Sequence, residues 1–545
     1  MNVNLLLITL IIFSCIFFNK ISFRFGIPTL FVFILLGMAF GSDGFARISF
    51  NNFALSETVC SVALIYIMFY GGFGTNWKMA RPVARQSILL STAGVFLTAL
   101  FLGLFLYLLL RREFWLCFLT GSALASTDAA SVFSVLRSQK LDLKENTASI
   151  LELESGSNDP MAYMLTLVCL SFLTGKADAG SILRLLTTQI VFGIAIGALC
   201  GLLSYRILKS VSFEVDGFDV IFIAGIALFS YALSAALGGN GYLSTYLTGI
   251  ILGNVKMGGK KNIVHFFDGL TGLMQMAVFF LLGLLATPSL LPGVLMSAVS
   301  VFLFLTLVAR PLAVKLLLLP FRASKGQSRL ISFAGLRGAS SIVFAIMAVQ
   351  TLKSDTRFFH IIFFVVLLSL LVQGSLLPFA ARRFHMIDLS NDVMKTFTDY
   401  SEELPVQFIQ LTLAEDNEWV GKHISELALP LQFLFLLIVR ENKKLVPKGT
   451  TLLEAGDSLI LCAPAVQTKN AMQLSEIEID KSSEYLHCHI RDINLPRGEI
   501  IFLIQRGNQS IIPNGQTEIL AGDVLMLTRL KEKTRPSRRP SGAPT

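Results

Sequence analysis

The chain has 545 residues, of which 54% are hydrophobic and only 15% are charged, whereas soluble proteins average about 25% charged residues. Its net charge is +9, but the lysines and arginines fall in short loops between apolar runs, as in membrane proteins. This composition argues against a soluble globular protein. It also argues against a nucleic-acid-binding one, because no basic stripe is interleaved with aromatic residues.

Residues 1–385 consist mostly of apolar runs, and the remainder is an ordinary polar sequence. Against the roughly 20 residues that a helix needs to cross a bilayer, we find about thirteen candidate runs. They lie near residues 3–19, 26–42, 53–73, 87–110, 114–136, 147–174, 182–208, 217–238, 241–255, 263–286, 291–319, 329–352 and 358–381. We therefore predict a polytopic α-helical membrane protein with a soluble tail.

Alternate loops between the apolar runs carry most of the basic residues, such as Lys78, Arg81 and Arg85 after the third run. Basic loops face the cytoplasm. We therefore predict a multi-pass protein of the cell (inner) membrane with its N-terminus outside and its tail inside. An odd number of spans requires these opposite ends.

The tail contains an internal repeat, in which the stretch 423–430 matches 489–496 and Arg440 and Asp457 recur as Arg506 and Asp523. We predict two β-rich copies that pack as one small two-lobed unit. The predicted boundaries are 1–385 for the membrane domain, 386–404 for a linker, 405–472 and 473–530 for the repeats, and 531–545 for a disordered basic end.

Signals for a bound metal or cofactor are weak in this chain. The seven cysteines form no CxxC pair, and His487 and His489 have only one counterpart in the first repeat, His423. A metal site there is disfavoured. No Gly-x-Gly-x-x-Gly motif precedes the repeats, so NAD binding is not expected. We predict no cofactor and no metal beyond a transported cation.

The sixth apolar run contains two acids, Glu154 and Asp159, within Glu-Ser-Gly-Ser-Asn-Asp-Pro-Met. A carboxylate near the bilayer centre costs about 2.5–3.5 kcal/mol on insertion scales. Helical spacing places Glu154 and Asn158 on one stripe, and Ser155 and Asp159 on the next. Such an array of oxygens suits an alkali cation or a proton. Pro160 predicts a kink beside Asp159.

The fifth run contains Ser-Thr-Asp-Ala-Ala-Ser, residues 126–131. A cluster of small hydroxyl residues around an acid, Asp128, favours an interrupted helix whose freed carbonyls could bind a cation. The alternative is a helix-packing motif of small residues.

Two arginines lie within the later apolar runs. Arg337 requires an anionic partner if it is buried, and we predict Glu154, which would leave Asp159 free to exchange ions. The alternative is that Arg337 extends to the cytoplasmic face, which is our expectation for Arg310. Glu152 is expected to line a wet vestibule.

Three motifs together give a specific resemblance: Ser-Thr-Asp at 126–128, Glu-Ser-Gly-Ser-Asn-Asp-Pro at 154–160, and Gly-Leu-Arg-Gly-Ala at 335–339. Residues 1–385 resemble the cation:proton antiporter-1 family of the NhaP type, and the tail resembles the RCK-C (TrkA-C) ligand-sensing module. The resemblance implies a thirteen-helix fold with two inverted repeats and a dimerising panel, hence a homodimer.

The resemblance also implies roles for individual residues. Asp159 would exchange cation and proton, and Asn158 would mark the electroneutral branch of the family. Thr127, Asp128 and Ser155 would complete the ion-binding site. Glu154 and Arg337 would support it by holding Asn158.

One position departs from the family pattern. Many relatives have an acid directly before a Gly-Gly pair in the third span, where this chain has Tyr70. A tyrosine cannot act as a carboxylate ligand, so ion preference can differ here.

These features favour an electroneutral K⁺ and/or Na⁺/H⁺ antiporter, not an enzyme, that uses alternating access and is regulated by its tail. Burial favours the neutral form of a carboxylate and a bound cation favours the charged form, so the two ions compete. The alternative is a ligand-gated cation channel, although we find no pore-filter loop. An intramembrane hydrolase using Ser155 or Ser157 lacks a nearby base. The tail could bind a small cytoplasmic ligand or only mediate dimer contacts.

Overall fold

A computed structural model describes residues 2–25, 28–139, 141–210, 217–255, 260–353 and 357–388 of the first part of the chain. In the tail it describes residues 406–415, 417, 419–427, 434–440, 443–464, 472–479, 483, 485–493, 495, 499–506, 509–511 and 513–530. The chain divides into two compact units, 1–402 and 403–545. The predicted disordered end and most of the predicted linker lie outside the described residues.

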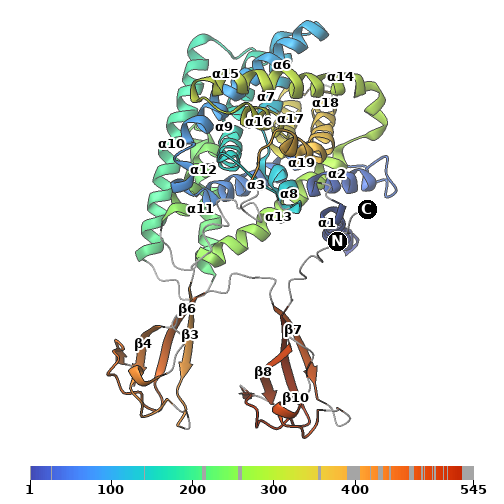
Figure 1. The fold of residues 1–545 in the computed structure, drawn as a ribbon. Helices are drawn as coiled ribbons and strands as arrows, with labels where there is room; N and C mark the ends of the chain where they lie inside the picture. Colours follow the sequence, from blue (N-terminus) through green and yellow to red (C-terminus); the bar gives the residue numbers. More distant parts are fainter. Residues whose placement is uncertain are drawn as a thin grey trace, which may run out of the picture. The chain divides into compact units, whose positions relative to one another are not determined.

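The first unit is a bundle of helices (Figure 1). They are α1 (Asn2–Phe25), α2 (Thr29–Phe40), α3 (Phe53–Gly74), α4 (Trp77–Ala80), α5 (Ala84–Leu89), α6 (Val95–Leu110), α7 (Phe114–Ala125), α8 (Ala129–Ser138), α9 (Thr147–Leu173), α10 (Ala179–Ser210), α11 (Phe218–Ala236), α12 (Gly241–Asn254), α13 (Lys260–Leu285), α14 (Leu291–Phe304), α15 (Arg310–Leu318), α16 (Lys325–Phe333), α17 (Ala339–Leu352), α18 (Arg357–Leu368) and α19 (Gly374–Arg383). Within the described residues, eight helical stretches are long and apolar enough to cross a membrane.

Single-turn π segments join α5 to α6, α14 to α15, and α18 to α19. Such segments often occur at functional sites. The second one, Leu305–Ala309, ends directly before Arg310. Each π segment lies inside a stretch that the sequence predicts as one membrane run.

Two of the predicted runs are interrupted helices that cross each other in the interior. The first breaks between α7 and α8, at Ser126–Asp128, and the second between α16 and α17, at 334–338. The backbone N–H of Asp128 donates to the carbonyl of Leu336 at 2.8 Å. A Cβ atom on Gly338 would lie 2.6 Å from Cβ of Asp128, so the close crossing requires glycine at this position. The predicted interruption near Asp128 is therefore present, and a second one faces it.

Helix α9 carries the acidic motif and packs against α7, α5, α12 and α17. It lies within the bundle, while α10 borders it (Figure 1). Most residues of α7 are buried, whereas only a minority of those of α10 are. The broken helices and α9 thus form the interior, where polar groups must find partners within the protein.

The first unit also contains a short two-stranded antiparallel sheet. Strand β1 (Asp142–Leu143) pairs with β2 (Ile387–Asp388). Met386, just before β2, is buried at 2% exposure. The first unit therefore extends beyond residue 385, where the sequence places the start of a linker.

The tail contains two four-stranded sheets. The first has strands β3 (Val406–Thr412), β4 (Leu434–Arg440), β5 (Lys443–Leu445) and β6 (Ser458–Pro464), in the order β3-β6-β4-β5. The second has β7 (Met472–Glu478), β8 (Glu499–Arg506), β9 (Gln509–Ile511) and β10 (Asp523–Leu530), in the order β7-β10-β8-β9. The two sheets share one strand order, as expected for an internal repeat.

Each sheet contains the same ion pair between a buried aspartate and a partly exposed arginine. Asp457 and Asp523 are fully buried. Arg440 donates to both oxygens of Asp457 at 2.7 and 2.8 Å, and Arg506 donates to both oxygens of Asp523 at 2.8 and 2.7 Å. A two-pronged guanidinium–carboxylate contact fixes geometry as well as charge. The arginine and aspartate that recur in both repeats therefore form the same structural contact in each.

Candidate functional site

The centre of the candidate site is Asp159, midway along α9. Its side chain is 8% exposed, and its Oδ1 atom accepts a hydrogen bond from the hydroxyl of Ser126 in the first helix break. The Ser126 hydroxyl also lies 2.9 Å from that of Ser340, in the first turn of α17. Residues from α9, from one break and from the start of α17 therefore meet at one carboxylate.

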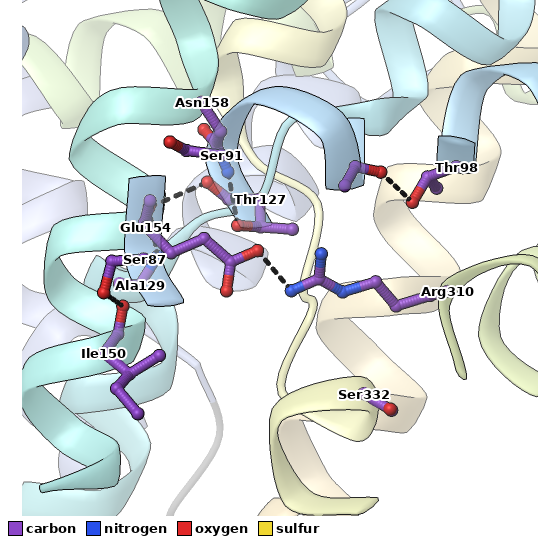
Figure 2. Close-up of polar contacts among 12 residues, drawn as sticks. Ser87, Ser91, Thr98, Thr127, Ala129, Ile150, Glu154, Asn158, Arg310 and Ser332 are labelled. Carbon is purple, nitrogen blue, oxygen red and sulfur yellow. Dashed lines mark hydrogen bonds and ion pairs between the residues drawn. The ribbon is translucent and has the colours of Figure 1, made fainter. Parts of the chain in front are cut away.

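Polar side chains of α9 hold the first break in place. Asn158 donates through Nδ2 to Oγ1 of Thr127 at 2.6 Å, as Figure 2 shows. Ser155 donates to the carbonyl of Thr127 at 2.8 Å and accepts from the backbone N–H of Ala129 at 2.9 Å. The unwound backbone groups are thus paired by the neighbouring helix, as the membrane interior demands.

Asp128 begins α8. Its Oδ1 atom accepts from the backbone N–H groups of Ala130 and Ser131 at 3.0 and 3.4 Å, and its Oδ2 atom accepts from the Ser131 hydroxyl at 2.6 Å. An aspartate at this position caps the helix. Its carboxylate therefore has a structural function at the helix start beside any contact with an ion.

The prediction that Glu154 pairs with Arg337 is wrong. Glu154 forms its ion pair with Arg310, at 2.5 Å between Oε1 and Nη2 (Figure 2). Both side chains are buried, at 1% and 2% exposure, so Arg310 does not extend to the cytoplasmic face. The physical reason is position: Arg310 is held at the start of α15, directly after a π turn, and points into the bundle.

Arg337 is also buried, at 1% exposure, but it binds the backbone. Its Nη1 atom donates to the carbonyl of Ser126 at 2.9 Å, and its own N–H donates to the hydroxyl of Ser369 at 3.1 Å. The contacts of Asn158 run to Thr127 and Ser126. The expectation that Glu154 and Arg337 hold Asn158 is therefore wrong, and Arg337 instead holds the first helix break.

A cavity of about 750 Å³ reaches this site. Its lining includes Asp159, Asp128, Thr127 and Ser155, together with Glu152. Asp159 therefore borders a space large enough for water and ions. Among the residues the structure describes, no group of three or more histidine, cysteine or acidic residues could hold a metal ion.

Two family models match this chain. One, described as the transmembrane sodium/hydrogen exchanger, matches residues 7–383, and the TrkA-C domain matches residues 408–472 and 474–528. The chain belongs to the sodium/hydrogen exchanger family. It is thus a multi-pass membrane antiporter with a TrkA-C tail, and the channel interpretation gains no support.

Known proteins resemble this exchanger over most of its length. The K(+)/H(+) antiporter NhaP2 of Shewanella sp. (strain MR-4) is 35% identical over 84% of this chain and 80% of that protein. The K(+)/H(+) antiporter NhaP of Alkalimonas amylolytica is 32% identical over 85% of this chain and 82% of that protein. The structure of the sodium proton antiporter MjNhaP1 from Methanocaldococcus jannaschii at pH 8 aligns with a TM-score of 0.62 and 23% identity, covering 69% of this chain and 97% of that one. This last similarity shows a shared fold.

The structure of the exchanger adds three residues that sequence reasoning did not select. Ser126 and Ser340 lie at Asp159. Ser126 belongs to the motif at 126–128 and Ser340 directly follows the motif at 335–339, so their hydroxyl groups were an available signal. Asp268 on α13 lines the same cavity and accepts a hydrogen bond from the hydroxyl of Tyr70. An acid thus contacts Tyr70 from another helix, at the position where the resemblance implies an acid.

Proposed function

We propose that this exchanger is an electroneutral antiporter that moves K⁺ and/or Na⁺ against H⁺ by alternating access at Asp159. The observation that carries the proposal is the position of Asp159, which is buried, borders the cavity and lies at a break in a neighbouring helix. Burying a carboxylate in the membrane interior costs free energy, and such residues generally mark ion or proton pathways.

The mechanism follows from competition for one carboxylate. A proton on Asp159 removes the negative charge that attracts a cation, and a bound cation disfavours protonation of the same carboxylate, so the two ions compete. Thr127, Asp128 and Ser155 supply further oxygens at the first helix break. A cycle that carries one proton one way and one monovalent cation the other way moves no net charge.

The cation is proposed from the chain's relatives. The two similar antiporters named above are K(+)/H(+) antiporters, and the family is named for sodium. Both are monovalent alkali ions, which oxygen ligands without a fixed geometry accept. We therefore include both, with K⁺ as the first ion to test.

The wider arrangement is part of the same proposal. Thirteen membrane spans with two inverted repeats, an inner-membrane location with the N-terminus outside, and a homodimer are consistent with the family. The tail, in two repeats near 405–472 and 473–530, would regulate exchange from the cytoplasm, with or without a small ligand.

The test compares Asp159→Asn with Asp178→Asn, which changes an exposed aspartate between α9 and α10. Everted vesicles are loaded with a proton gradient, and dequenching is followed on addition of K⁺ or Na⁺. We expect Asp159→Asn to abolish exchange and Asp178→Asn to preserve it, at equal protein in the membrane. Retained cation-coupled proton flux in Asp159→Asn would refute the assignment, and flux that follows an imposed voltage would refute electroneutrality.

A further inference from the structure

The short sheet formed by β1 and β2 joins two distant parts of the chain, and we call it the clasp. Asp142 pairs with Asp388 and Leu143 pairs with Ile387 in antiparallel register. The pairing continues with one more hydrogen bond, from the N–H of Lys144 to the carbonyl of Met386 at 2.9 Å. The clasp thus ties the loop between α8 and α9 to the segment that follows α19.

Side chains anchor both halves of the clasp. Leu143 is 6% exposed and Met386 is 2% exposed. A Cβ atom on Gly326, in the first turn of α16, would lie 2.7 Å from the carbonyl oxygen of Phe384 and 3.0 Å from Sδ of Met386. The chain around Met386 therefore packs closely against α16. Through its pairing with β2, the loop between α8 and α9 is held next to this helix.

Helix α16 also binds the loop directly. Gln327 donates through Nε2 to the carbonyl of Glu145 at 2.9 Å, and Ser324 donates to the Glu145 carboxylate at 2.8 Å. Glu145 and Asn146 both have positive φ, at 59° and 52°, so the loop turns sharply before α9 begins. Movement of the loop would therefore be passed to the first turn of α9.

The clasp links the segment that leads to the tail with the loop between the two site helices through hydrogen bonds. The loop that contains β1 joins α8, which begins at Asp128, to α9, which carries Asp159. Strand β2 is followed along the chain by residues 389–405 and then by β3 of the first repeat. Along the chain, β2 is thus the described element of the first unit that directly precedes the tail, and it is paired with the loop between the two site helices.

We propose that the clasp is the element through which the tail regulates exchange: pairing of β2 with β1 fixes the α8–α9 loop, and the tail sets how often that pairing opens. The inference rests on the proposed regulatory function of the tail. A pairing of so few residues is only marginally stable by itself, so a modest change in the tail is enough to shift it. Segments that order and disorder in this way are a common basis of switching.

The experiment changes the tail and the clasp independently in the full-length chain. Asp457→Asn weakens the ion pair between Arg440 and the buried Asp457 in the first repeat, far along the chain from the clasp. Leu143→Cys with Ile387→Cys places two cysteines opposite each other at a pair whose neighbours, Lys144 and Met386, are hydrogen bonded. Residues at such positions have closely spaced Cβ atoms, so a disulfide can lock the clasp, and a reductant releases it. Leu143→Cys alone is the matched control.

Two readouts are measured in each protein: cation-dependent proton exchange in vesicles, and hydrogen–deuterium exchange of residues 141–145 and 386–388. With the clasp reduced, we expect Asp457→Asn to change the exchange rate by about fivefold or more, the lower range of allosteric coupling, and to change deuterium uptake at the clasp. With the clasp oxidised, Asp457→Asn should have no effect on either readout. Reduction should restore the effect.

The outcomes separate this inference from the proposed function beneath it. If Asp457→Asn changes exchange equally in locked and reduced protein, and clasp deuterium uptake stays constant, the tail acts by another route and the clasp proposal fails alone. If Asp457→Asn leaves exchange unchanged in every background, tail regulation fails and the clasp proposal fails with it. If the disulfide stops exchange completely, deuterium uptake at the clasp is compared between Asp457→Asn and the unchanged sequence, both without the added cysteines. Equal uptake in the two proteins would then refute the clasp proposal.

Discussion

The Glu154–Arg310 ion pair makes a quantitative prediction. The two groups are 2.5 Å apart and at most 2% exposed, so removing one leaves the other charge buried without its partner. Such a loss destabilises a protein by about 3–5 kcal/mol, whereas replacing both partners with apolar residues is often close to neutral. We therefore expect Glu154→Gln and Arg310→Met each to lower stability strongly, and the double variant to lose less than the sum.

Arg337 provides the matched control, because the sequence predicts it as the partner of Glu154. Thermal unfolding in detergent is measured for all single variants and for both double variants, Glu154→Gln with Arg310→Met and Glu154→Gln with Arg337→Met. Residues in contact couple by about 0.5–3 kcal/mol, and we expect the Arg310 pair to be near the upper end. A larger coupling between Glu154 and Arg337 than between Glu154 and Arg310 would overturn the contact described here.

Three further predictions test the surroundings of the site and the tail. Ser340→Ala removes one hydroxyl near Asp159 and should weaken apparent cation affinity about tenfold or less, as expected for one hydrogen bond of roughly 1 kcal/mol; unchanged affinity in the vesicle assay would remove Ser340 from the site. Tyr70→Phe removes the hydrogen bond to the Asp268 carboxylate and should shift the K⁺-to-Na⁺ preference without stopping exchange. Asp268→Asn should reduce both K⁺/H⁺ and Na⁺/H⁺ exchange. Identical ion selectivity in Tyr70→Phe and in the unchanged chain would contradict this prediction. In the tail, hydrogen bonds from Arg506 hold the pKa of Asp523 below its ordinary value of 3.8. This carboxylate therefore stabilises the folded tail above about pH 4, and its contribution is lost as pH falls through the lowered pKa. Deuterium uptake of β8 and β10 should rise on acidification, and it should rise less steeply in Asp523→Asn.

Much of the fold follows from sequence because apolar length is a strong signal. The predicted run 147–174 corresponds to α9 (Thr147–Leu173), and the short ninth run corresponds to α12 (Gly241–Asn254). The break at residues 126–128 follows from small polar residues around an acid. The matching break at 334–338 is harder to predict, because glycines such as Gly335 and Gly338 equally favour close helix packing. Only the contact between Asp128 and Leu336 distinguishes the two interpretations.

Pairing of buried charges could not be predicted with the same success. The sequence identifies Glu154, Arg310 and Arg337 as buried or near-buried charges, but it does not state which guanidinium reaches which carboxylate. The choice depends on where α15 and α16 stand relative to α9, and these helices are separated by more than a hundred residues along the chain. Asp268 was overlooked for the same reason, since its partner Tyr70 lies on another helix.

The contacts of Asn158 bear on why the exchanger would move no net charge. Its Nδ2 atom donates to Oγ1 of Thr127 at 2.6 Å, and its Oδ1 atom lies 3.3 Å from Oγ of Ser126, whose single proton Asn158 shares with Asp159. An amide held in this way positions the helix break and has little freedom to follow a passing ion. Glu154 is neutralised by Arg310. Asp128 caps α8, so Asp159 is the carboxylate at the helix break that we propose to exchange ions, and one such carboxylate would account for an exchange of one proton for one cation.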